Sequence, residues 1–236
     1  MSLGPGEIDV LSFAVDLPPP TISELAALLA DDERARADRF RFDRDRGRFI
    51  AARGLLRTIL GHYADREPRE LRFEYGPFGK PELQPEPGGT RLRFNLSCSE
   101  GLGVLGIRRD EAIGIDVERL RALDDAPAIS RRMFAAEEHA ALMARPEPER
   151  SRIFFGYWTR KEAVLKSLGV GLSGPMHGFV LPPEPSPTME PVRVCGEGEA
   201  ALQWLCPLPA PLPGFVAALA TAAEPGGVRC RPWPFS

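Results

Sequence analysis

Two short stretches hold the residues whose types and spacing could do chemistry. Residues 112–118 are mostly apolar and strand-like, yet they include Asp116 and Glu118. Residues two apart on a strand face the same side, so these two carboxylates would lie together. They repel each other unless a cation lies between them or both face water. Because the donors are oxygen atoms, with no His or Cys in the segment, such a cation would be Mg²⁺ or Mn²⁺ rather than Zn²⁺.

The second stretch, residues 158–166, contains good helix formers and neither Gly nor Pro, which predicts a helix. Trp158, Glu162 and Lys166 are spaced four residues apart, so they lie roughly on one stripe of that helix. A carboxylate and an ammonium one turn apart suit a metal ion beside a phosphate. An ordinary Glu–Lys pair on a helix surface is the alternative, and this stretch alone favours it.

Basic residues are distributed unevenly. Of the 30, 27 are Arg and three are Lys, at Lys80, Lys161 and Lys166. We interpret the three exceptions as positions that require the compact ammonium of lysine, and two of them lie in the predicted helix. Nine Arg and three Asp between residues 34 and 57 form a basic patch. This patch is either a solvated helix face or a site for phosphates.

Composition and charge narrow the class of protein. A chain of 236 residues with 43% hydrophobic content and a net charge of −3 is typical of a globular protein and argues against a nucleic-acid binder. No secretory signal and no apolar run of transmembrane length is visible, so we expect a cytoplasmic protein with no membrane partner. The four Cys lack metal-binding spacing and are expected to be free thiols. The three His form no evident triad and are expected to be structural.

The predicted elements repeat in the same order. Residues 1–112 predict a strand, a helix, a long helix and further strands, and residues 113–236 repeat this order. We therefore expect an α+β monomer of two similar, pseudo-two-fold-related lobes, each an antiparallel sheet packed by helices, with a ligand cleft between them. Strands are predicted at 8–15, 71–75, 92–96, 103–108, 112–118, 192–194, 203–205 and 215–220, helices at 21–30, 44–64, 129–143 and 151–168, and an extended tail from residue 225.

Four motifs in this order and spacing resemble the 4′-phosphopantetheinyl transferases of the longer, pseudo-dimeric Sfp type. The resemblance covers about residues 30 to 180. The combination of Asp-x-Glu with the motif in the helix is specific, whereas either part alone is weak. The motifs are Gly79-Lys80-Pro81, Phe94-Asn95-Leu96-Ser97-Cys98-Ser99, Gly114-Ile115-Asp116-Val117-Glu118 and Trp158-x-x-Lys161-Glu162-Ala163-x-x-Lys166.

The resemblance implies an activity and a set of site residues. Such enzymes transfer the phosphopantetheine arm of coenzyme A to a serine of an apo acyl or peptidyl carrier protein and release adenosine 3′,5′-bisphosphate. The catalytic group would be Glu162 as general base, Lys166 on the pyrophosphate, and Asp116. Mg²⁺, or alternatively Mn²⁺, would be bound by Asp116, Glu118 and Glu162. Coenzyme A would be contacted by Arg48 or Arg53 at the 3′-phosphate, Gly79, Lys80 and Pro81 at the adenine, Lys161 towards the pantetheine, and Ser97, Cys98, Ser99 and Lys166.

One departure from the family pattern concerns substrate affinity. Cys98 stands where the family commonly has a His that contacts phosphate, and a thiol cannot offer the positive charge of a His. We therefore expect weaker coenzyme A binding than in a His-bearing relative, unless Cys98 is a buried structural residue. The family's carriers are acidic, so Arg119, Arg121, Arg131 and Arg132, with Met133 and Phe134, are the expected docking residues.

Two other functions remain possible on the sequence. One is a catalytically weak or inactive homologue that only binds coenzyme A or a carrier protein, although all three carboxylates and Lys166 are present. The other is a nucleotide-dependent transferase of a different class that uses Asp-x-Glu with Mg²⁺. The absence of a P-loop or kinase signature from the sequence argues against this second class.

Overall fold

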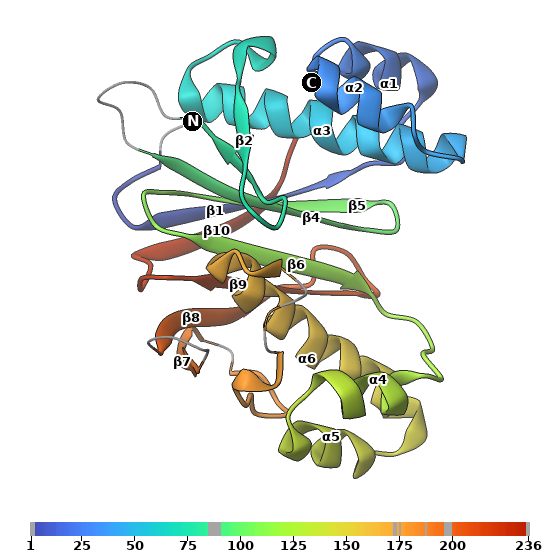
Figure 1. Cartoon of the computed structure of the whole chain (residues 1–236), viewed down its shortest axis with the longest axis vertical. Helices are drawn as coiled ribbons and strands as arrows, with labels where there is room; N and C mark the ends of the chain where they lie inside the picture. The colour runs from blue at the N-terminus through green and yellow to red at the C-terminus, as the bar shows by residue number, and fades with distance from the viewer. Residues whose placement is uncertain are drawn as a thin grey trace.

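The computed structural model describes residues 3–84, 91–171, 174, 176–186, 188–195 and 200–234 (Figure 1). It confirms an α+β fold of two lobes, each with a four-stranded sheet and a 22-residue helix. The first lobe contains β1 (Glu7–Ala14), α1 (Pro19–Ala26), α2 (Asp31–Ala37), α3 (Asp43–Ala64), η1 (Pro68–Glu70), β2 (Phe73–Tyr75), β3 (Pro81–Leu83), β4 (Leu92–Ser99) and β5 (Leu102–Arg109). The second contains β6 (Ile113–Arg119), α4 (Ala126–Met133), α5 (Ala136–Met143), α6 (Glu147–Leu168), η3 (Met176–Gly178), β7 (Glu190–Val194), β8 (Ala201–Leu208) and β9 (Phe215–Thr221), and β10 (Gly227–Pro232) follows.

The two sheets share one topology. Their strand orders are β10-β1-β5-β4 and β6-β9-β8-β7, and β2 and β3 form a separate ribbon. In the first lobe β1 pairs antiparallel with β5, and β5 forms a hairpin with β4. In the second lobe β6 pairs antiparallel with β9, and β9 forms a hairpin with β8. Three helices separate the first strand from that hairpin in both lobes. This common order is the pseudo-two-fold repeat that the sequence predicted.

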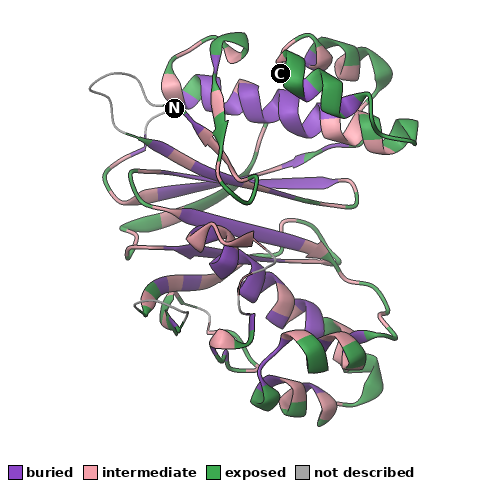
Figure 2. Ribbon diagram, viewed as in Figure 1, coloured by how far each residue is buried: buried purple, intermediate pink, exposed green. Residues whose placement is uncertain are grey.

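The lobes stack as four layers. Figure 1 shows the two sheets in the middle, with α3 on the outer side of one and α6 on the outer side of the other. Alternate residues of β5 serve different cores: Leu105 packs under α3, whereas Val104 packs between the sheets with Ile113 and Ile115 of β6. Figure 2 shows the buried residues concentrated along these strands and along the two long helices. Within the described residues, no helix combines the length and the apolar content needed to cross a membrane.

The helices of the second lobe differ from the prediction at two points. The single helix expected at 129–143 is two helices, because Phe134 and Ala135 adopt extended backbone angles between α4 and α5. The Glu138 carboxylate accepts a hydrogen bond from Ala135 N at 2.9 Å and thereby caps α5. The long helix begins at Glu147 rather than residue 151, because Pro148 lies in its first turn, where no N–H donor is needed.

The C-terminal boundary of the lobes also needs correction. The second lobe was predicted to include all residues from 113 to 236, with an extended tail. Instead, β10 pairs in parallel with β1 and so joins the sheet of the first lobe. Arg229 and Arg231 of β10 donate hydrogen bonds to the fully buried Asp9 of β1, at 2.7 Å and 3.2 Å. The strand is mostly exposed and lacks an apolar alternation, so its sequence contains no signal for a partner.

A glycine allows α6 to approach β6 closely. A Cβ atom at Gly114 would overlap the carbonyl oxygen of Ala163 and the amide nitrogen of Ser167, both in α6. Any larger residue would therefore force the helix away from the strand. Because Asp116 is two residues further along β6 and Glu162 lies beside Ala163, this contact sets the distance between the strand carboxylates and the helix carboxylate.

We predict that Gly114→Ala destabilises the fold by about 1–3 kcal/mol, as expected for overpacking against a rigid backbone. The measurement is the free energy of unfolding in urea. Gly156→Ala in the same helix is the matched control, because its Cβ would meet no atom within 4 Å. The control should be neutral or stabilising by about 0.5–1 kcal/mol, since Ala is a better helix former than Gly. Equal stability of the two variants would contradict the close contact.

Candidate functional site

A cleft of about 490 Å³ opens where four parts of the chain meet. These parts are the end of β4, the end of β6, the second half of α6 and the turn between β2 and β3. Most of the residues predicted for the site line this cleft. They are Gly79, Lys80, Pro81, Ser97, Cys98, Asp116, Glu118, Glu162 and Lys166, and the cleft is completed by Phe78, Asn95, Val117, Trp158, Gly169 and Gly171.

Side chains, rather than a backbone ladder, connect β4 to β6. Each of these strands is the edge strand of its own sheet. Asn95 Oδ1 accepts a hydrogen bond from Ile115 N at 2.8 Å. Ser97 Oγ donates to Asp116 at 2.9 Å, and Ser99 Oγ donates to Glu118 at 2.9 Å. The alternate residues of β4 therefore fix the two strand carboxylates, and Ser99 does so without itself lining the cleft.

The predicted stripe on α6 faces these carboxylates. Lys166 Nζ forms an ion pair with Asp116 Oδ1 at 2.6 Å and donates to Ser97 Oγ at 3.2 Å. The pair is protected from water on one side, since the Asp116 side chain is 6% exposed and that of Lys166 27%. The Glu–Lys pair on α6 is therefore not an ordinary surface pair, because both residues line the cleft.

Burial raises the pKa of all three carboxylates, and repulsion from neighbouring carboxylates adds to the shift at Glu118 and Glu162. Burial raises the pKa of Asp116, and Lys166 partly counteracts this. Burial likewise raises the pKa of Glu118, against the hydrogen bond from Ser99. The pKa of Glu162 is raised to about 7, chiefly by burial, with Lys166 opposing the shift and the other two carboxylates adding to it. A carboxyl group with a pKa near 7 can both accept and release a proton at neutral pH.

The oxygen donors of the cleft suit a divalent cation in part. Asp116 Oδ2 and Glu162 Oε1 are buried and have no hydrogen-bond partner among the described residues. Unpaired buried carboxylate oxygens are costly unless a cation or a donor satisfies them, and Mg²⁺ prefers such oxygens. Within the same residues, however, no three acidic, His or Cys side chains converge closely enough to form a complete metal site. Lys166 supplies the positive charge at Asp116 instead.

Cys98 is exposed in the cleft, which rules out the alternative of a buried structural residue. The atoms that surround its thiol still reduce hydration enough to raise the pKa of Cys98 to about 11, although Lys166 acts in the opposite direction. The thiol is therefore neutral at physiological pH. It offers neither the charge of a protonated His nor a reactive thiolate.

Lys80 lines the cleft, but its ammonium is used inside the protein. Its Nζ donates to the backbone oxygens of Ile113 and Lys166, at 2.9 Å and 2.5 Å. Burial lowers the pKa of Lys80 to about 8, with Glu82 opposing the shift. Because one acceptor is in the last turn of α6 and the other starts β6, Lys80 anchors both catalytic elements to the turn at Gly79.

Lys161 was predicted to contact coenzyme A, and the structure contradicts this. Its side chain is completely buried and forms an ion pair with Glu138 at 2.9 Å. Lys161 and Glu162 are adjacent on α6, so their side chains are turned about 100° apart around the helix axis. Glu162 therefore faces the cleft while Lys161 faces the interior of the second lobe.

The two arginines predicted for the 3′-phosphate differ in burial and in their ion-pair partners. Arg53 lies in a buried pair with Glu33, at 2.7 Å, and does not line the cleft, which contradicts a role in binding. Arg48 is partly exposed and binds Asp16 through two hydrogen bonds of 2.6 Å and 2.7 Å. A Cβ at Gly101 would touch Asp16, so this pair lies beside the β4–β5 turn, near the end of β4 that carries Ser99. Arg48 does not line the cleft either, but it borders a separate hollow with Asp16, so its role at the 3′-phosphate stays a prediction.

Three residues of the cleft were missed or left undecided by the sequence. Trp158 stacks on Phe154 with ring centroids 5.6 Å apart, so it packs into the second lobe and also forms part of the cleft wall. Phe78 is exposed at the cleft and touches Gly171. Asn95 was part of a recognised motif, but only its buried position beside Ile115 reveals that it joins the two sheets.

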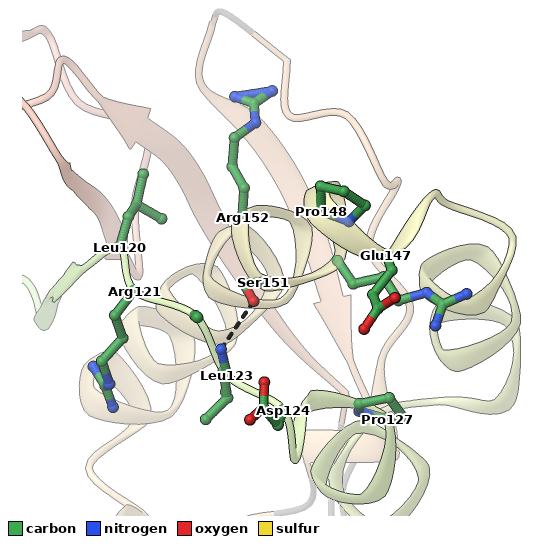
Figure 3. A pocket seen from close by; sticks show the side chains of 11 residues that line it. Leu120, Arg121, Leu123, Asp124, Pro127, Glu147, Pro148, Ser151 and Arg152 are labelled. Atoms are coloured by element: carbon green, nitrogen blue, oxygen red, sulfur yellow. Dashed lines mark hydrogen bonds between the residues drawn. The ribbon is translucent and has the colours of Figure 1, made fainter.

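A second cavity, of about 570 Å³, lies along the first half of α6 (Figure 3). Ser151 Oγ accepts a hydrogen bond from Leu123 N at 3.0 Å, which holds the segment after β6 against the helix. Arg121 and Arg152 extend from opposite sides of this bond in Figure 3. Ser151 and the cleft residue Trp158 are about two turns apart on α6, so they lie on the same face of the helix. The cavity is lined by residues 120–124, Pro127, Glu147, Pro148 and residues 150–152.

Comparisons with known proteins point to one family. Residues 112–209 match the family model described as the 4′-phosphopantetheinyl transferase superfamily. The 4′-phosphopantetheinyl transferase HetI of Nostoc sp. is 41% identical over 167 residues, which are 71% of this chain and 70% of HetI. The 4′-phosphopantetheinyl transferase psf-1 of Bacillus pumilus is 33% identical over 198 residues, 81% and 78% of the two chains. Sfp of Bacillus subtilis is 28% identical over 153 residues, 65% and 66% of the two chains.

Proposed function

The chain belongs to the 4′-phosphopantetheinyl transferase family, and on this premise we propose that it transfers the 4′-phosphopantetheine arm of coenzyme A to a serine of an apo acyl or peptidyl carrier protein. The products are the holo carrier and adenosine 3′,5′-bisphosphate. The observation that carries the proposal is the meeting of Asp116, Glu162 and Lys166 in one cleft. We further propose a monomeric, cytoplasmic enzyme that needs neither nucleic acid nor a membrane.

The reaction exchanges one phosphorus–oxygen bond for another. The carrier serine oxygen attacks the phosphorus that bears the pantetheine arm, and the bond from that phosphorus to the bridging oxygen of the diphosphate breaks. Glu162, which faces the cleft, accepts the serine proton, and adenosine 3′,5′-bisphosphate leaves with the bridging oxygen. Because the nucleophile belongs to the partner, the enzyme needs no nucleophilic side chain of its own.

Charge neutralisation is the main task of the cleft. We propose that Asp116, Glu118 and Glu162 would hold Mg²⁺, with Mn²⁺ as a substitute, after moving closer together than they lie in this structure. The bound ion would supply Lewis-acid neutralisation of the diphosphate. The two unpartnered carboxylate oxygens support this donor set. Lys166 contributes a second positive charge from its position beside Asp116. Ser97 and Ser99 orient the strand carboxylates and thereby keep the donors in place.

Coenzyme A would extend from this charged centre towards the first lobe. We propose that Gly79 and Pro81 border the adenine, with Lys80 holding their turn in place from behind. Arg48 is the proposed partner of the 3′-phosphate and would exchange its present partner, Asp16, for the phosphate. A binding-only homologue without catalysis is the alternative, and holo-carrier formation in the presence of Mg²⁺ would exclude it.

The first test is incubation with coenzyme A, Mg²⁺ and a panel of apo carrier proteins, followed by intact-mass measurement. We predict that Glu162→Gln lowers kcat for transfer by about a hundred- to ten-thousand-fold, because the isosteric amide cannot accept the serine proton. Chelation of Mg²⁺ with EDTA should abolish transfer by the wild-type protein. The circular dichroism spectrum and Tm of the variant should show an intact fold.

Glu149→Gln is the control for this variant, because Glu149 is exposed near the start of the same helix. It should retain wild-type activity. Folded wild-type protein that modifies no carrier in the panel would overturn the proposed function. A fully active Glu162→Gln variant would overturn only the role of Glu162.

Cys98 generates a prediction of improved binding. We expect Cys98→His to lower the Michaelis constant for coenzyme A severalfold, because a protonated His adds a charge-assisted hydrogen bond to phosphate. The gain should shrink above about pH 6.5, where His loses its charge. Cys195→His, at an exposed position outside the cleft, is the control. An unchanged Michaelis constant in Cys98→His at pH 6 would show that position 98 does not meet phosphate.

Carrier docking is proposed at four arginines on α4 and at or just after the end of β6, of which Arg121 lines the second cavity. Arg131 and Arg132 are exposed on the last turn of α4, and Arg119 and Arg121 are exposed at the end of β6. Arg121 lies over the ring of Phe155 at 5.0 Å, which fixes its direction. The expectation for Phe134 needs correction, because this ring is buried against Phe154 and cannot meet a partner. An acidic carrier helix placed here would lie next to the cleft.

We predict that Arg131→Glu with Arg132→Glu raises the Michaelis constant for the carrier about tenfold, since each charge reversal replaces an attraction with a repulsion. The Michaelis constant for coenzyme A should not change. Arg69→Glu with Arg72→Glu, two exposed positions of the first lobe, is the control with the same charge change. A carrier Michaelis constant equal in both double variants would refute this docking surface.

A further inference from the structure

Lys161 is a buried cation that the proposed reaction does not use. Its ammonium has three N–H donors, and three acceptors surround it. They are Met176 O at 2.6 Å, Phe179 O at 2.7 Å and Glu138 Oε2 at 2.9 Å. The ring of Phe179 lies 4.1 Å from the same nitrogen. An arginine has a larger, planar group with five donors, so this site requires the lysine that the arginine-rich composition otherwise avoids.

Glu138, the partner of Lys161, is itself fully engaged. Its Oε2 accepts a hydrogen bond from Ala135 N, and its Oε1 accepts one from Leu181 N at 2.8 Å. The pair therefore joins α5, α6 and residues 176–181 at a single point. Removal of either charge alone would leave the other charge buried without its counter-ion, which is strongly destabilising.

A chain of backbone hydrogen bonds leads from Lys161 to the cleft. Met176, whose carbonyl oxygen Lys161 binds, donates its N–H to Gly174 O at 2.9 Å. Gly174 in turn donates its N–H to Gly171 O at 3.1 Å. Gly171 lines the cleft beside Phe78, since a Cβ atom at Gly171 would lie 3.2 Å from the Cβ of Phe78. The position of this wall therefore depends on the two carbonyl groups that Lys161 holds.

We propose that Lys161 is a positioning residue for coenzyme A: its buried ammonium fixes residues 176–179 and, through Gly174, the cleft wall formed by Gly171 and Phe78. The inference rests on the proposed function for the identity of the ligand. Lys161 does not touch the substrate. It acts by keeping the wall in the conformation that the substrate requires, which reduces the ordering cost of binding.

Two variants distinguish a positioning role of Lys161 from a contribution to the stability of the fold alone. Lys161→Met keeps roughly the length of the side chain and removes the ammonium, but it leaves the Glu138 carboxylate without a counter-ion. Lys161→Met with Glu138→Gln removes both charges, so it should regain much of the Tm lost in the single variant. We expect both variants to bind coenzyme A about tenfold more weakly, measured as the Kd by calorimetry, because neither can hold the two carbonyl groups.

Two further measurements sharpen the test. Amide hydrogen exchange at Gly174 and Met176 should be faster in both variants than in the wild type, since their anchor is lost. Tyr63→Phe is the matched control, because it removes a hydrogen bond to the buried Asp9 in the first lobe and lowers stability elsewhere. This control should leave both the Kd and the exchange at Gly174 unchanged.

The binding and exchange measurements distinguish a positioning role of Lys161 from a purely structural one. A folded double variant whose Kd for coenzyme A stays within about twofold of the wild type would overturn the positioning role and leave Lys161 purely structural. A tenfold higher Kd with faster exchange would support it. Because the Kd needs no carrier protein, wild-type protein that binds coenzyme A but transfers nothing would refute the proposed function while this comparison still decides the role of Lys161.

Discussion

The close contact of α6 with β6 at Gly114 is the constraint on which the site depends. It places a helix carboxylate, Glu162, beside the strand carboxylates Asp116 and Glu118. Three acids in one partly buried cleft repel one another, so the fold must supply positive charge and donors to keep them together. Lys166 and the serines of β4 supply part of this compensation. A bound metal ion would satisfy Asp116 Oδ2 and Glu162 Oε1, which have no hydrogen-bond partner in the described part of the chain.

The duplicated architecture explains why such a cleft exists. Each lobe could expose the edge strand of its sheet, which would invite pairing with another chain. Here the edge strands β4 and β6 lie against each other and are joined by polar side chains instead of a regular ladder. Polar residues at this seam are therefore both structural and functional. The same serine that links the sheets also orients a carboxylate of the site.

The sequence predicted the repeat and the long helices because each is encoded by local periodicity, whereas the grouping of Glu162 with Asp116 and Glu118 came from the resemblance to the family. Alternation on β6 and the four-residue spacing on α6 identify the faces that carry Asp116 and Glu162 without any tertiary information. Other features depend on contacts that no local pattern encodes. The parallel pairing of β10 with β1 rests on Arg229 and Arg231 reaching a buried Asp9 more than two hundred positions away. Neither the break between α4 and α5 nor the approach at Gly114 has a composition signal.

The resemblance to the family led us to expect more basic residues in contact with coenzyme A than the structure allows. Arg53 and Lys161 belong to the conspicuous basic set, yet each serves a buried ion pair, with Glu33 and Glu138 respectively. Lys80 lies at the cleft but donates to backbone carbonyl groups. A small ammonium can satisfy several converging carbonyl groups, a geometry that the planar guanidinium group does not match. The three lysines of this arginine-rich chain are therefore explained by anchoring at Lys80 and Lys161, and by charge compensation of a carboxylate at Lys166.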